Sequence, residues 1–374
     1  MTKGTEELLT RGVSEVIDRH SLEKKLSSGK KLRVKLGIDP TSPNIHIGRA
    51  IPLWKLKAFQ ELGHTAVFIV GDATGVVGDT SDKDSERPML TQEQVKVNME
   101  TYFDQAFKIL DPEKTETHYN SEWLSKLGLI ELVKMANIFG LHEFESREVI
   151  AKRMKAGQRV SFHELLYPLM QGYDSVAVKA DVELGGTDQR FNLLTARRIQ
   201  PLYGQEPQDI IMTKLLEGTD GRKMSSSWGN VINLTDEAKE MFGKVMSIKD
   251  ELVSKYFELA TNISTDEVEE IIKSHPKEAK MRLAFEITKI YHGEKSAKDA
   301  EESFEETFSK GGIPKDIETV QVSKDTPLVE TLLKQGLISS KTEFNRLNKE
   351  GAIKEIENGV YRIGKHRFLR IEFL

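Results

Sequence analysis

The sequence predicts an α/β protein: a parallel-sheet domain, then an α-helical domain and a small α+β domain at the C-terminus. Two apolar runs rich in β-branched residues, 32–39 and 65–72, flank a segment with helical periodicity. This order is typical of a βαβ unit, whose parallel strands are buried on both faces. Residues 235–308 are helical in pattern throughout, and the last fifty residues show two helical patterns followed by short strands.

Length and composition indicate a globular protein with more than one domain. A chain of 374 residues is long for a single core, and 38% of it is hydrophobic and 30% charged. There are no cysteines, which excludes disulfides and thiolate metal sites, and the nine histidines lack zinc-binding spacing. A net charge of −5 argues against indiscriminate coating of nucleic acid.

The N-terminal stretch MTKGTEELLTRGVSEVI (1–17) predicts an amphipathic helix. It lacks the apolar core of a signal peptide, and no apolar run in the chain is long enough to span a bilayer. We therefore expect a cytoplasmic protein without a membrane partner.

The remaining elements are predicted by periodicity and by their ends. The helix after the first strand ends at Gly63, and two further strands are expected at 179–186 and 208–216. Helical patterns at 91–110, 121–155 and 161–173 predict an insertion between the halves of the α/β domain, and 309–327 is typical of a linker. The predicted domains are 1–232, 233–308 and 325–374, with the linker at 309–324.

The turn after the first strand, PTSPNIHIGRA (40–50), is a candidate phosphate site. Ligands bind at the carboxyl ends of strands in open α/β sheets, and helix N-termini attract phosphates. Glycine permits close backbone approach, histidine can donate to a phosphate oxygen, and arginine adds a fixed charge. No GxGxxG follows, so a dinucleotide is not implied. The candidate residues are Asp39, Thr41, His46, Gly48 and Arg49.

A second candidate is the loop GRKMSSSWGN (221–230). A serine run alone is more often a solvated turn. Paired with the first turn, however, Lys223 and the backbone of Met224, Ser225 and Ser226 can close over a triphosphate. The lysine would then neutralise charge that grows as pyrophosphate leaves.

The two motifs, HIGR and KMSSS, resemble the HIGH and KMSKS signatures of class I aminoacyl-tRNA synthetases. The stretches GDATGVVGDTSDKDSERP (71–88), YPLMQGYDS (167–175) and VELGGTDQRFNLL (182–194) resemble the bacterial type of tyrosyl-tRNA synthetase. The resemblance covers essentially the whole chain. It implies a Rossmann-like catalytic domain that activates L-tyrosine with ATP and transfers it to tRNA(Tyr).

The resemblance also assigns the tyrosine site. Tyr167, Gln171 and Asp174 are spaced i, i+4 and i+7, which places them on one helix face. Spacing alone equally fits an ordinary polar face. The family implies that Asp174 meets the substrate phenol, while Tyr167, Gln171 and Asp79 meet the α-ammonium group.

Further family positions concern ATP and the reacting groups. In GGTDQ, Gly186 would let the AMP ribose approach, Asp188 would accept from a ribose hydroxyl, and Gln189 would orient the reacting carbonyl. Without the resemblance this stretch is a strand-to-helix turn with an N-cap candidate. Lys83 and Arg87 lie on a polar loop, and the family places them near the pyrophosphate and the tRNA acceptor end.

Three residues depart from the family pattern. Arg49 replaces the second histidine of the first signature, and Ser226 replaces a lysine of the second. Lys223 is then the main charge of its loop, with a monovalent cation at Lys223–Ser227 as a candidate helper. Lys35 stands where some members have a tyrosine that donates to the substrate phenol. It either donates in the same way or lies along the strand, and the sequence leaves both open.

The C-terminal segment resembles a small RNA-binding fold found in a small-subunit ribosomal protein and in pseudouridine synthases. Lys341, Arg346 and Lys349 lie on or near its second helix and suit RNA phosphates, which position without reading sequence. Thr342 and Phe344 depart from the usual serine and alanine. A solvated amphipathic helix is the alternative interpretation.

The resemblance implies further partners. The helical domain would contact the anticodon stem, and the insertion would form a symmetric homodimer. ATP would enter with Mg²⁺, and the reaction needs neither a covalent enzyme intermediate nor a general base, because positioning and charge stabilisation carry it.

Parts of the sequence also fit three other functions. A small-molecule nucleotidyltransferase shares the adenylate chemistry but lacks the C-terminal regions. An inactive synthetase retained for RNA binding is suggested only by Arg49 and Ser226, and tryptophan or a tyrosine analogue is a minor alternative substrate. The residues that argue for an active tyrosyl enzyme are Asp79, Gln171, Asp174, Asp188, Gln189 and Lys223.

Overall fold

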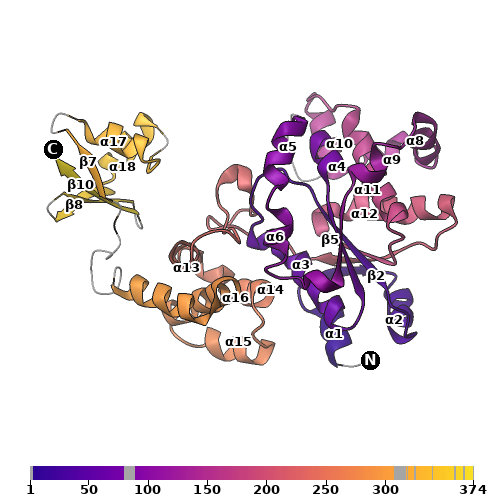
Figure 1. Cartoon of the computed structure of the whole chain (residues 1–374), viewed down its shortest axis with the longest axis horizontal. Helices are drawn as coiled ribbons and strands as arrows, with labels where there is room; N and C mark the ends of the chain where they lie inside the picture. Colours follow the sequence, from indigo (N-terminus) through magenta and orange to yellow (C-terminus); the bar gives the residue numbers. More distant parts are fainter. Residues whose placement is uncertain are drawn as a thin grey trace.

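The computed structural model describes residues 3–79, 89–306, 317, 319–323, 326–338, 340–357, 359–364 and 367–373. Figure 1 shows an α/β part, a helical part in orange and a small C-terminal part in yellow. The predicted α/β class is confirmed. No helix within the described ranges combines the length and apolarity needed to cross a bilayer.

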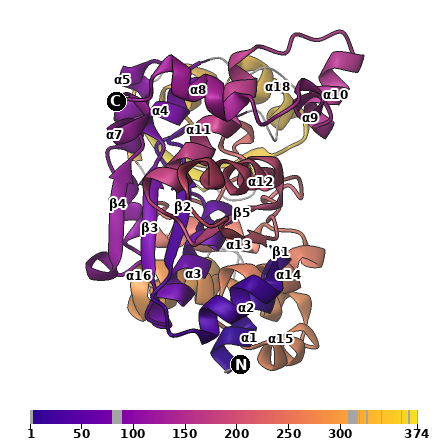
Figure 2. The same cartoon turned by 90° about the vertical axis from the view of Figure 1, so that its right-hand side faces the viewer.

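The central sheet has six strands in the order β1-β6-β5-β2-β3-β4. Every neighbouring pair is parallel except β1 and β6, which are antiparallel. Figure 2 shows β4, β3, β2 and β5 side by side. The strands are β1 (Val13–Ile17), β2 (Arg33–Ile38), β3 (Thr65–Val70), β4 (Thr115–Tyr119), β5 (Val182–Gly186) and β6 (Asp209–Thr213).

The predicted βαβ unit is confirmed. Strands β2 and β3 pair in register from Arg33–Thr65 to Ile38–Val70, and their apolar side chains are almost all buried. Helix α3 (Ile47–Glu61) connects them and buries its apolar face. It ends before Gly63, whose φ of +90° is a left-handed conformation that favours glycine. The strands expected at 179–186 and 208–216 are β5 and β6.

Two edge strands correct the sequence prediction. The N-terminal helix α1 (Lys3–Thr10) stops short of residue 17, because Gly12 turns the chain with φ +66° and β1 then pairs with β6. Strand β4 has the polar sequence TETHY, which carries no strand signal, yet it pairs with β3 along its whole length. Helix α2 (Arg19–Ser27) follows β1.

α-Helices fill much of the chain between β3 and β6, and all of them except α4 (Asp72–Val77) and α12 (Arg190–Ile199) lie in or overlap the segments predicted to be helical. Two of them, α11 (His163–Ala177) and α12, pack on each other beside β5. The others are α5 (Gln92–Met99), α6 (Tyr102–Ala106), α7 (Ser121–Leu124), α8 (Leu129–Ala136), α9 (Leu141–Glu145) and α10 (Glu148–Lys155).

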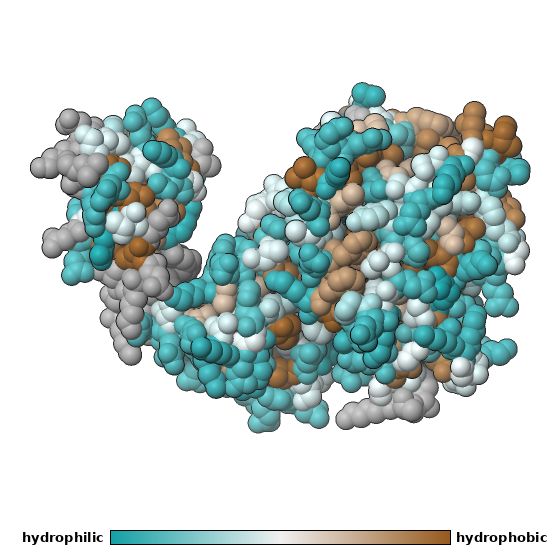
Figure 3. Space-filling model, viewed as in Figure 1, coloured by the Kyte–Doolittle hydropathy of each residue, from teal (hydrophilic) through white to brown (hydrophobic). Residues whose placement is uncertain are grey.

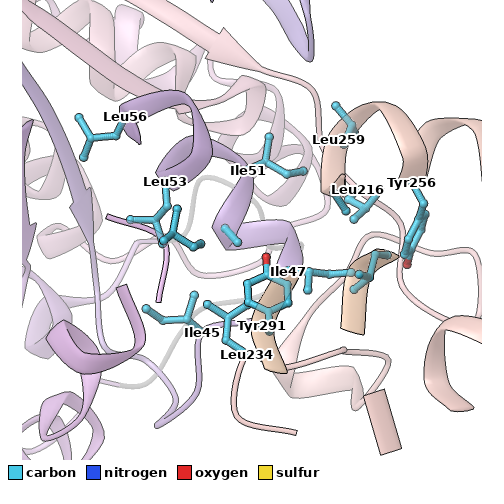
Figure 4. Packing of buried hydrophobic residues seen from close by; sticks show 14 of the residues in the cluster. Ile45, Ile47, Ile51, Leu53, Leu56, Leu216, Leu234, Tyr256, Leu259 and Tyr291 are labelled. Carbon is cyan, nitrogen blue, oxygen red and sulfur yellow. The ribbon is translucent and has the colours of Figure 1, made fainter. Parts of the chain in front are cut away.

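The helical part shares its hydrophobic core with the α/β part. Figure 4 shows Ile47 and Ile51 of α3 beside Tyr256 and Tyr291 of the helical part. Tyr291 also accepts a hydrogen bond from Trp54 Nε1 at 3.2 Å. The helices are α13 (Ala238–Met246), α14 (Val253–Ala260), α15 (Thr265–Ile272) and α16 (Pro276–Phe304), as the periodicity predicts.

The C-terminal part has its own sheet and its own core. The sheet order is β7-β10-β9-β8, with α17 (Leu328–Lys334) and α18 (Lys341–Lys349) packed on it around Leu332, Ile363 and Leu369. Its strands are β7 (Thr319–Val322), β8 (Ile353–Glu357), β9 (Val360–Ile363) and β10 (Arg367–Phe373). The predicted linker is therefore wrong at β7, which pairs with β10. The domain limits themselves stay a prediction.

Candidate active site

A cavity of about 390 Å³ lies at the carboxyl ends of β2, β5 and β6. It collects side chains from the segments that follow these strands, as expected for an open α/β sheet. The predicted residues that line it are Asp39, Thr41, His46, Gly48, Arg49, Asp79, Tyr167, Gln171, Asp174, Gly186, Asp188, Gln189, Lys223, Met224, Ser225 and Ser226. Lys83 and Arg87 lie outside the described residues.

Arg49 is tied into the turn that precedes its own helix. Its guanidinium donates to the Asp39 carbonyl (3.3 Å), to Thr41 Oγ1 (2.9 Å) and to the Tyr102 hydroxyl (3.2 Å). This longer cation therefore stiffens the first turn while still bordering the cavity.

His46 is the N-cap of α3, and its protonation state follows from its surroundings. Its Nδ1 accepts from the backbone N–H of Arg49 at 3.3 Å. Burial and the nearby charges of Arg49 and Lys223 lower the pKa of His46 to about 3. The ring is neutral, so its hydrogen is on Nε2, which can donate to an anionic oxygen.

The two signature segments touch each other. Ser42 Oγ donates to Ser226 Oγ at 3.1 Å, and Met224 is anchored in the main core. A Cβ on Gly48 would come within 3.1 Å of His46 Nδ1 and 3.4 Å of Met224 Sδ. Glycine at this position therefore lets the loop approach the first turn.

Within the second loop, Asn230 sets the backbone and Lys223 reaches across the cavity. Asn230 Oδ1 accepts from the N–H of Ser225 (2.8 Å), and its amide nitrogen donates to the Lys223 carbonyl (3.1 Å). Lys223 Nζ forms an ion pair with Asp188 Oδ2 at 2.8 Å. The predicted phosphate lysine thus contacts the predicted ribose acceptor.

The predicted ammonium acceptors are linked to neighbouring groups. Tyr167 donates its hydroxyl hydrogen to Asp39 Oδ2 at 2.9 Å, which leaves the phenol oxygen as an acceptor. Burial raises the pKa of Asp39 to about 6. Gln189 Nε2 donates to Asp79 Oδ2 at 2.7 Å, so the residue predicted for the ammonium group and the one predicted for the carbonyl hold each other.

Asp174 is a buried carboxylate held by two donors. Trp123 Nε1 donates to Oδ1 at 2.7 Å, and Asn120 Nδ2 donates to Oδ2 at 3.2 Å. Burial raises the pKa of Asp174 to about 7, against the opposing effects of Lys35, Trp123 and Asn120. The carboxylate borders the cavity, where it can accept one further hydrogen bond.

Lys35 is fully buried, and its amine is surrounded by protein groups. It donates to Glu183 Oε1 (2.8 Å), Ser175 Oγ (2.9 Å) and the Gln171 carbonyl (3.0 Å). Of the two interpretations of Lys35, these contacts favour a charge held within the protein, although direct donation to a substrate stays a prediction.

Several residues that hold the predicted side chains in place were not predicted from the sequence, among them Thr74, Asn120, Trp123 and Glu183. Asn120 and Trp123 follow β4, and because that strand was not predicted, its carboxyl end could not be placed beside the site. Thr74, which accepts from Asn120 at 2.8 Å, lies on a short helix after β3. Glu183 was a readable signal, because a carboxylate within an apolar parallel strand requires a partner.

Comparisons with known proteins agree with this geometry. The family model described as tRNA synthetases class I (W and Y) matches residues 27–309. A tyrosine–tRNA ligase of Nitratidesulfovibrio vulgaris is 45% identical over 98% of this chain and 97% of that protein. One from Thermotoga maritima is 44% identical over 97% and 96%. The chain belongs to the tyrosyl-tRNA synthetase family.

Solved structures of tyrosyl-tRNA synthetases share the fold. The enzyme from Archaeoglobus fulgidus, complexed with L-tyrosine, has a TM-score of 0.64 at 23% identity, covering 80% of this chain and all of that one. A truncated mitochondrial enzyme of Aspergillus nidulans has a TM-score of 0.68 at 22% identity, covering 82% and 95%.

A tyrosyl-tRNA synthetase needs two kinds of group in one cavity, and both are present here. Oxygen acceptors for a phenol and an ammonium group lie on α11 and beside it. Hydrogen-bond donors and a cation for phosphates lie at the start of α3 and on the second loop.

Proposed function

We propose that this chain ligates L-tyrosine to tRNA(Tyr) through a tyrosyl-adenylate, and that the cavity described above is its active site. The observation that carries the proposal is that one cavity is lined by the buried Asp174 and also by Lys223 and His46. The first group suits a phenol hydroxyl, and the other two suit a triphosphate. We also propose that the enzyme works in the cytoplasm, where translation occurs.

The substrate tyrosine is held at both of its polar ends. Asp174 accepts the phenol hydrogen, and Trp123 and Asn120 fix the carboxylate for that contact. Tyr167, through the phenol oxygen left open by Asp39, accepts from the α-ammonium group together with Gln171 and Asp79. Phenylalanine is rejected because it brings no donor for the hydrogen bond that the buried Asp174 offers to the cavity.

In the first step, a carboxylate oxygen of tyrosine attacks the α-phosphorus of ATP, and the bond to the bridging oxygen of pyrophosphate breaks. The protein contributes position and charge rather than a covalent intermediate. His46 Nε2 donates to a phosphate oxygen, Asp188 accepts from the ribose, and Lys223 stabilises charge on the leaving pyrophosphate. Gly186 permits the ribose to approach the backbone.

In the second step, a ribose hydroxyl of the terminal tRNA adenosine attacks the tyrosyl carbonyl, and AMP leaves with its electron pair. Gln189, which is held by its hydrogen bond to Asp79, orients this carbonyl. Lys83 and Arg87, which lie outside the described residues, are proposed to serve pyrophosphate and the acceptor end.

Magnesium is proposed to arrive with ATP as part of the substrate. In the described portion of the chain, no group of three or more His, Cys, Asp or Glu side chains is arranged to hold a metal ion. The phosphate oxygens, which suit Mg²⁺, would then supply its ligands. A monovalent cation near Lys223–Ser227 is a further proposal, motivated by the charge lost at Ser226.

The test is ATP–pyrophosphate exchange measured separately with each of the twenty amino acids. Exchange with tyrosine alone is expected, because Asp174 selects a phenol. Folded protein that exchanges with no amino acid would contradict the proposed activity, and exchange with tryptophan would contradict the substrate.

The C-terminal part is proposed to bind tRNA through α18. Lys341, Arg346 and Lys349 are exposed, with Arg346 paired to Glu350 at 3.2 Å on the same helix. Replacing all three basic residues with alanine should raise the KM for tRNA about tenfold and leave pyrophosphate exchange unchanged. Lys114→Ala, at an exposed lysine just before β4, is the control. Equal KM values would remove α18 from tRNA binding.

A symmetric homodimer is proposed at the helical insertion. Leu129, Ile130 and Val133 of α8 are 73%, 70% and 56% exposed, as is Phe162 at 73%. Figure 3 shows apolar atoms gathered at the upper right, where Figure 1 places α8. Apolar patches of this kind mark contact surfaces. Ile130→Glu should convert a dimer to a monomer in analytical ultracentrifugation, and a wild-type monomer would contradict the proposal.

A further inference from the structure

We propose that the buried pair Lys35–Glu183 is a positioning unit for substrate tyrosine, which holds the amide of Gln171 in its binding orientation. Glu183 borders the cavity and Lys35 does not, and the pair needs no contact with the substrate. The inference rests on the proposed function and deepens it, because it adds two residues that position a tyrosine-binding side chain.

The two charges lie on neighbouring strands and are out of contact with water. Lys35 on β2 and Glu183 on β5 are a register pair, and their residues are 0% and 1% exposed. Their Nζ and Oε1 atoms are 2.8 Å apart. A buried ion pair is costly unless every remaining donor and acceptor is satisfied.

Each polar atom of the pair has partners. Glu183 Oε1 accepts from Lys35 and from Gln171 Nε2 (3.2 Å). Glu183 Oε2 accepts from Ser175 Oγ (3.0 Å) and from Gln208 Nε2. The Glu183 carboxylate therefore accepts four hydrogen bonds, which uses the full acceptor capacity of its two oxygens.

This arrangement fixes which end of Gln171 points into the cavity. The side-chain Nε2 of Gln171 donates to Glu183 Oε1, and Lys35 donates to the backbone carbonyl of Gln171 at 3.0 Å. The side-chain oxygen of Gln171 is then the end left for the α-ammonium group of tyrosine. If the amide were reversed, its NH₂ would face the ammonium group and repel it.

The decisive variant is Glu183→Gln, assayed by pyrophosphate exchange in the full-length enzyme. A glutamine offers one acceptor oxygen to four donors, so the Gln171 amide loses its fixed orientation. The KM for tyrosine should rise about tenfold, the worth of one hydrogen bond to a charged group, while the KM for ATP stays within about twofold. Ser175→Ala, which keeps both charges, should raise the tyrosine KM by less than about threefold.

The matched control is Glu164→Gln on α11. Glu164 forms an equally buried pair with Arg153, at 2.6 Å and 1%/0% side-chain exposure, but it does not line the cavity. Both variants should lower Tm, and only Glu183→Gln should raise the tyrosine KM. The double variant Lys35→Met/Glu183→Gln should regain Tm while keeping the raised tyrosine KM.

The outcomes separate the inference from the proposed function. A tyrosine KM of Glu183→Gln within twofold of the wild-type value, with a lower Tm, would show that the pair is only structural and would overturn the inference. A wild-type enzyme that fails to exchange with tyrosine would instead overturn the proposed function.

Discussion

The two ends of the cavity are built differently. At the tyrosine end, Lys35, Glu183 and Asp174 are 0%, 1% and 3% exposed, and each is held by two or more partners on strands and helices. At the phosphate end, Lys223 and Asp188 are 30% and 20% exposed, and the contacts of the loop are mainly to its own backbone and hydroxyls.

This difference in burial suits the two ends to different tasks: the buried end to substrate recognition and the more exposed end to the rate of the reaction. Buried, fully paired polar groups are costly to leave unsatisfied, so they discriminate between substrates that differ by one hydroxyl. A half-exposed lysine on a glycine-bounded loop discriminates little, but it can follow charge that appears only in the transition state. Four predictions test this division.

The largest effect is expected at the phosphate end. Lys223→Ala should slow adenylate formation about 10²- to 10³-fold, because it removes the charge placed at the leaving pyrophosphate. Tyrosine affinity should hardly change. Single-turnover kinetics and equilibrium binding measure the two quantities, and Arg222→Ala, an exposed neighbour stacked on Trp228, is the control. A normal rate in Lys223→Ala would remove the loop from the mechanism.

The second prediction concerns discrimination. Asp174→Asn should weaken tyrosine binding about 10- to 100-fold, because the acceptor for the phenol loses its charge. Phenylalanine binding should change far less, so the ratio of the two kcat/KM values should fall. An unchanged ratio would show that discrimination arises elsewhere in the pocket.

The third prediction is a pH dependence. Burial raises the pKa of Asp174 to about 7, and Glu183 adds to the rise while Lys35, Trp123 and Asn120 oppose it. Only the ionised carboxylate accepts the phenol hydrogen without competition from its own proton. Tyrosine affinity should therefore fall as pH drops below about 7, approaching tenfold per pH unit, and level off above it.

Equilibrium binding of tyrosine between about pH 5.5 and 8.5 measures this profile. Asp174→Asn, which has no titrating group at that position, should bind with a nearly flat profile. A flat wild-type profile would mean that Asp174 stays ionised throughout this range.

The smallest effect is expected where the two signature segments touch. Ser42→Ala removes the 3.1 Å bond to Ser226 Oγ and the 3.2 Å bond to the Asn44 carbonyl, and these two acceptors can then bond to water. Adenylate formation should slow by less than about threefold. A decrease of more than tenfold in the rate of adenylate formation would show that the loop depends on this contact.

The elements that the sequence predicted have strong periodicity or clear ends. Strands β2, β3, β5 and β6 are apolar runs, and Gly63 marks the end of α3. The missed strands β1, β4, β7 and β8 are the edge strands of the two sheets, and each has only four or five residues. Edge strands form through pairing with a neighbour, and local pattern does not encode that pairing.

The site divides in the same way. Family motifs predicted the residues that face the cavity, and the structure brings all of those it describes together except Lys35 and the tail residues. The partners of Asp174 and Lys35 could not be predicted, because Lys35 and Glu183 are 148 positions apart in the chain and meet only through strand pairing. Asn120 depends on β4 in the same way.

Lys223 and Asp188 form an ion pair with each other. If ATP binds as proposed, Lys223 exchanges this partner for the phosphates and Asp188 exchanges it for the ribose. In the proposed ATP complex a ribose hydroxyl bonds to Asp188, which weakens the ion pair, and Lys223 turns toward the triphosphate beside it. Both side chains are partly exposed, at 30% and 20%, so water screens the ion pair and lowers the cost of breaking it. In this proposal, binding of ATP moves the Lys223 charge from Asp188 to the phosphates, where the reaction requires it, at a small cost in ATP affinity.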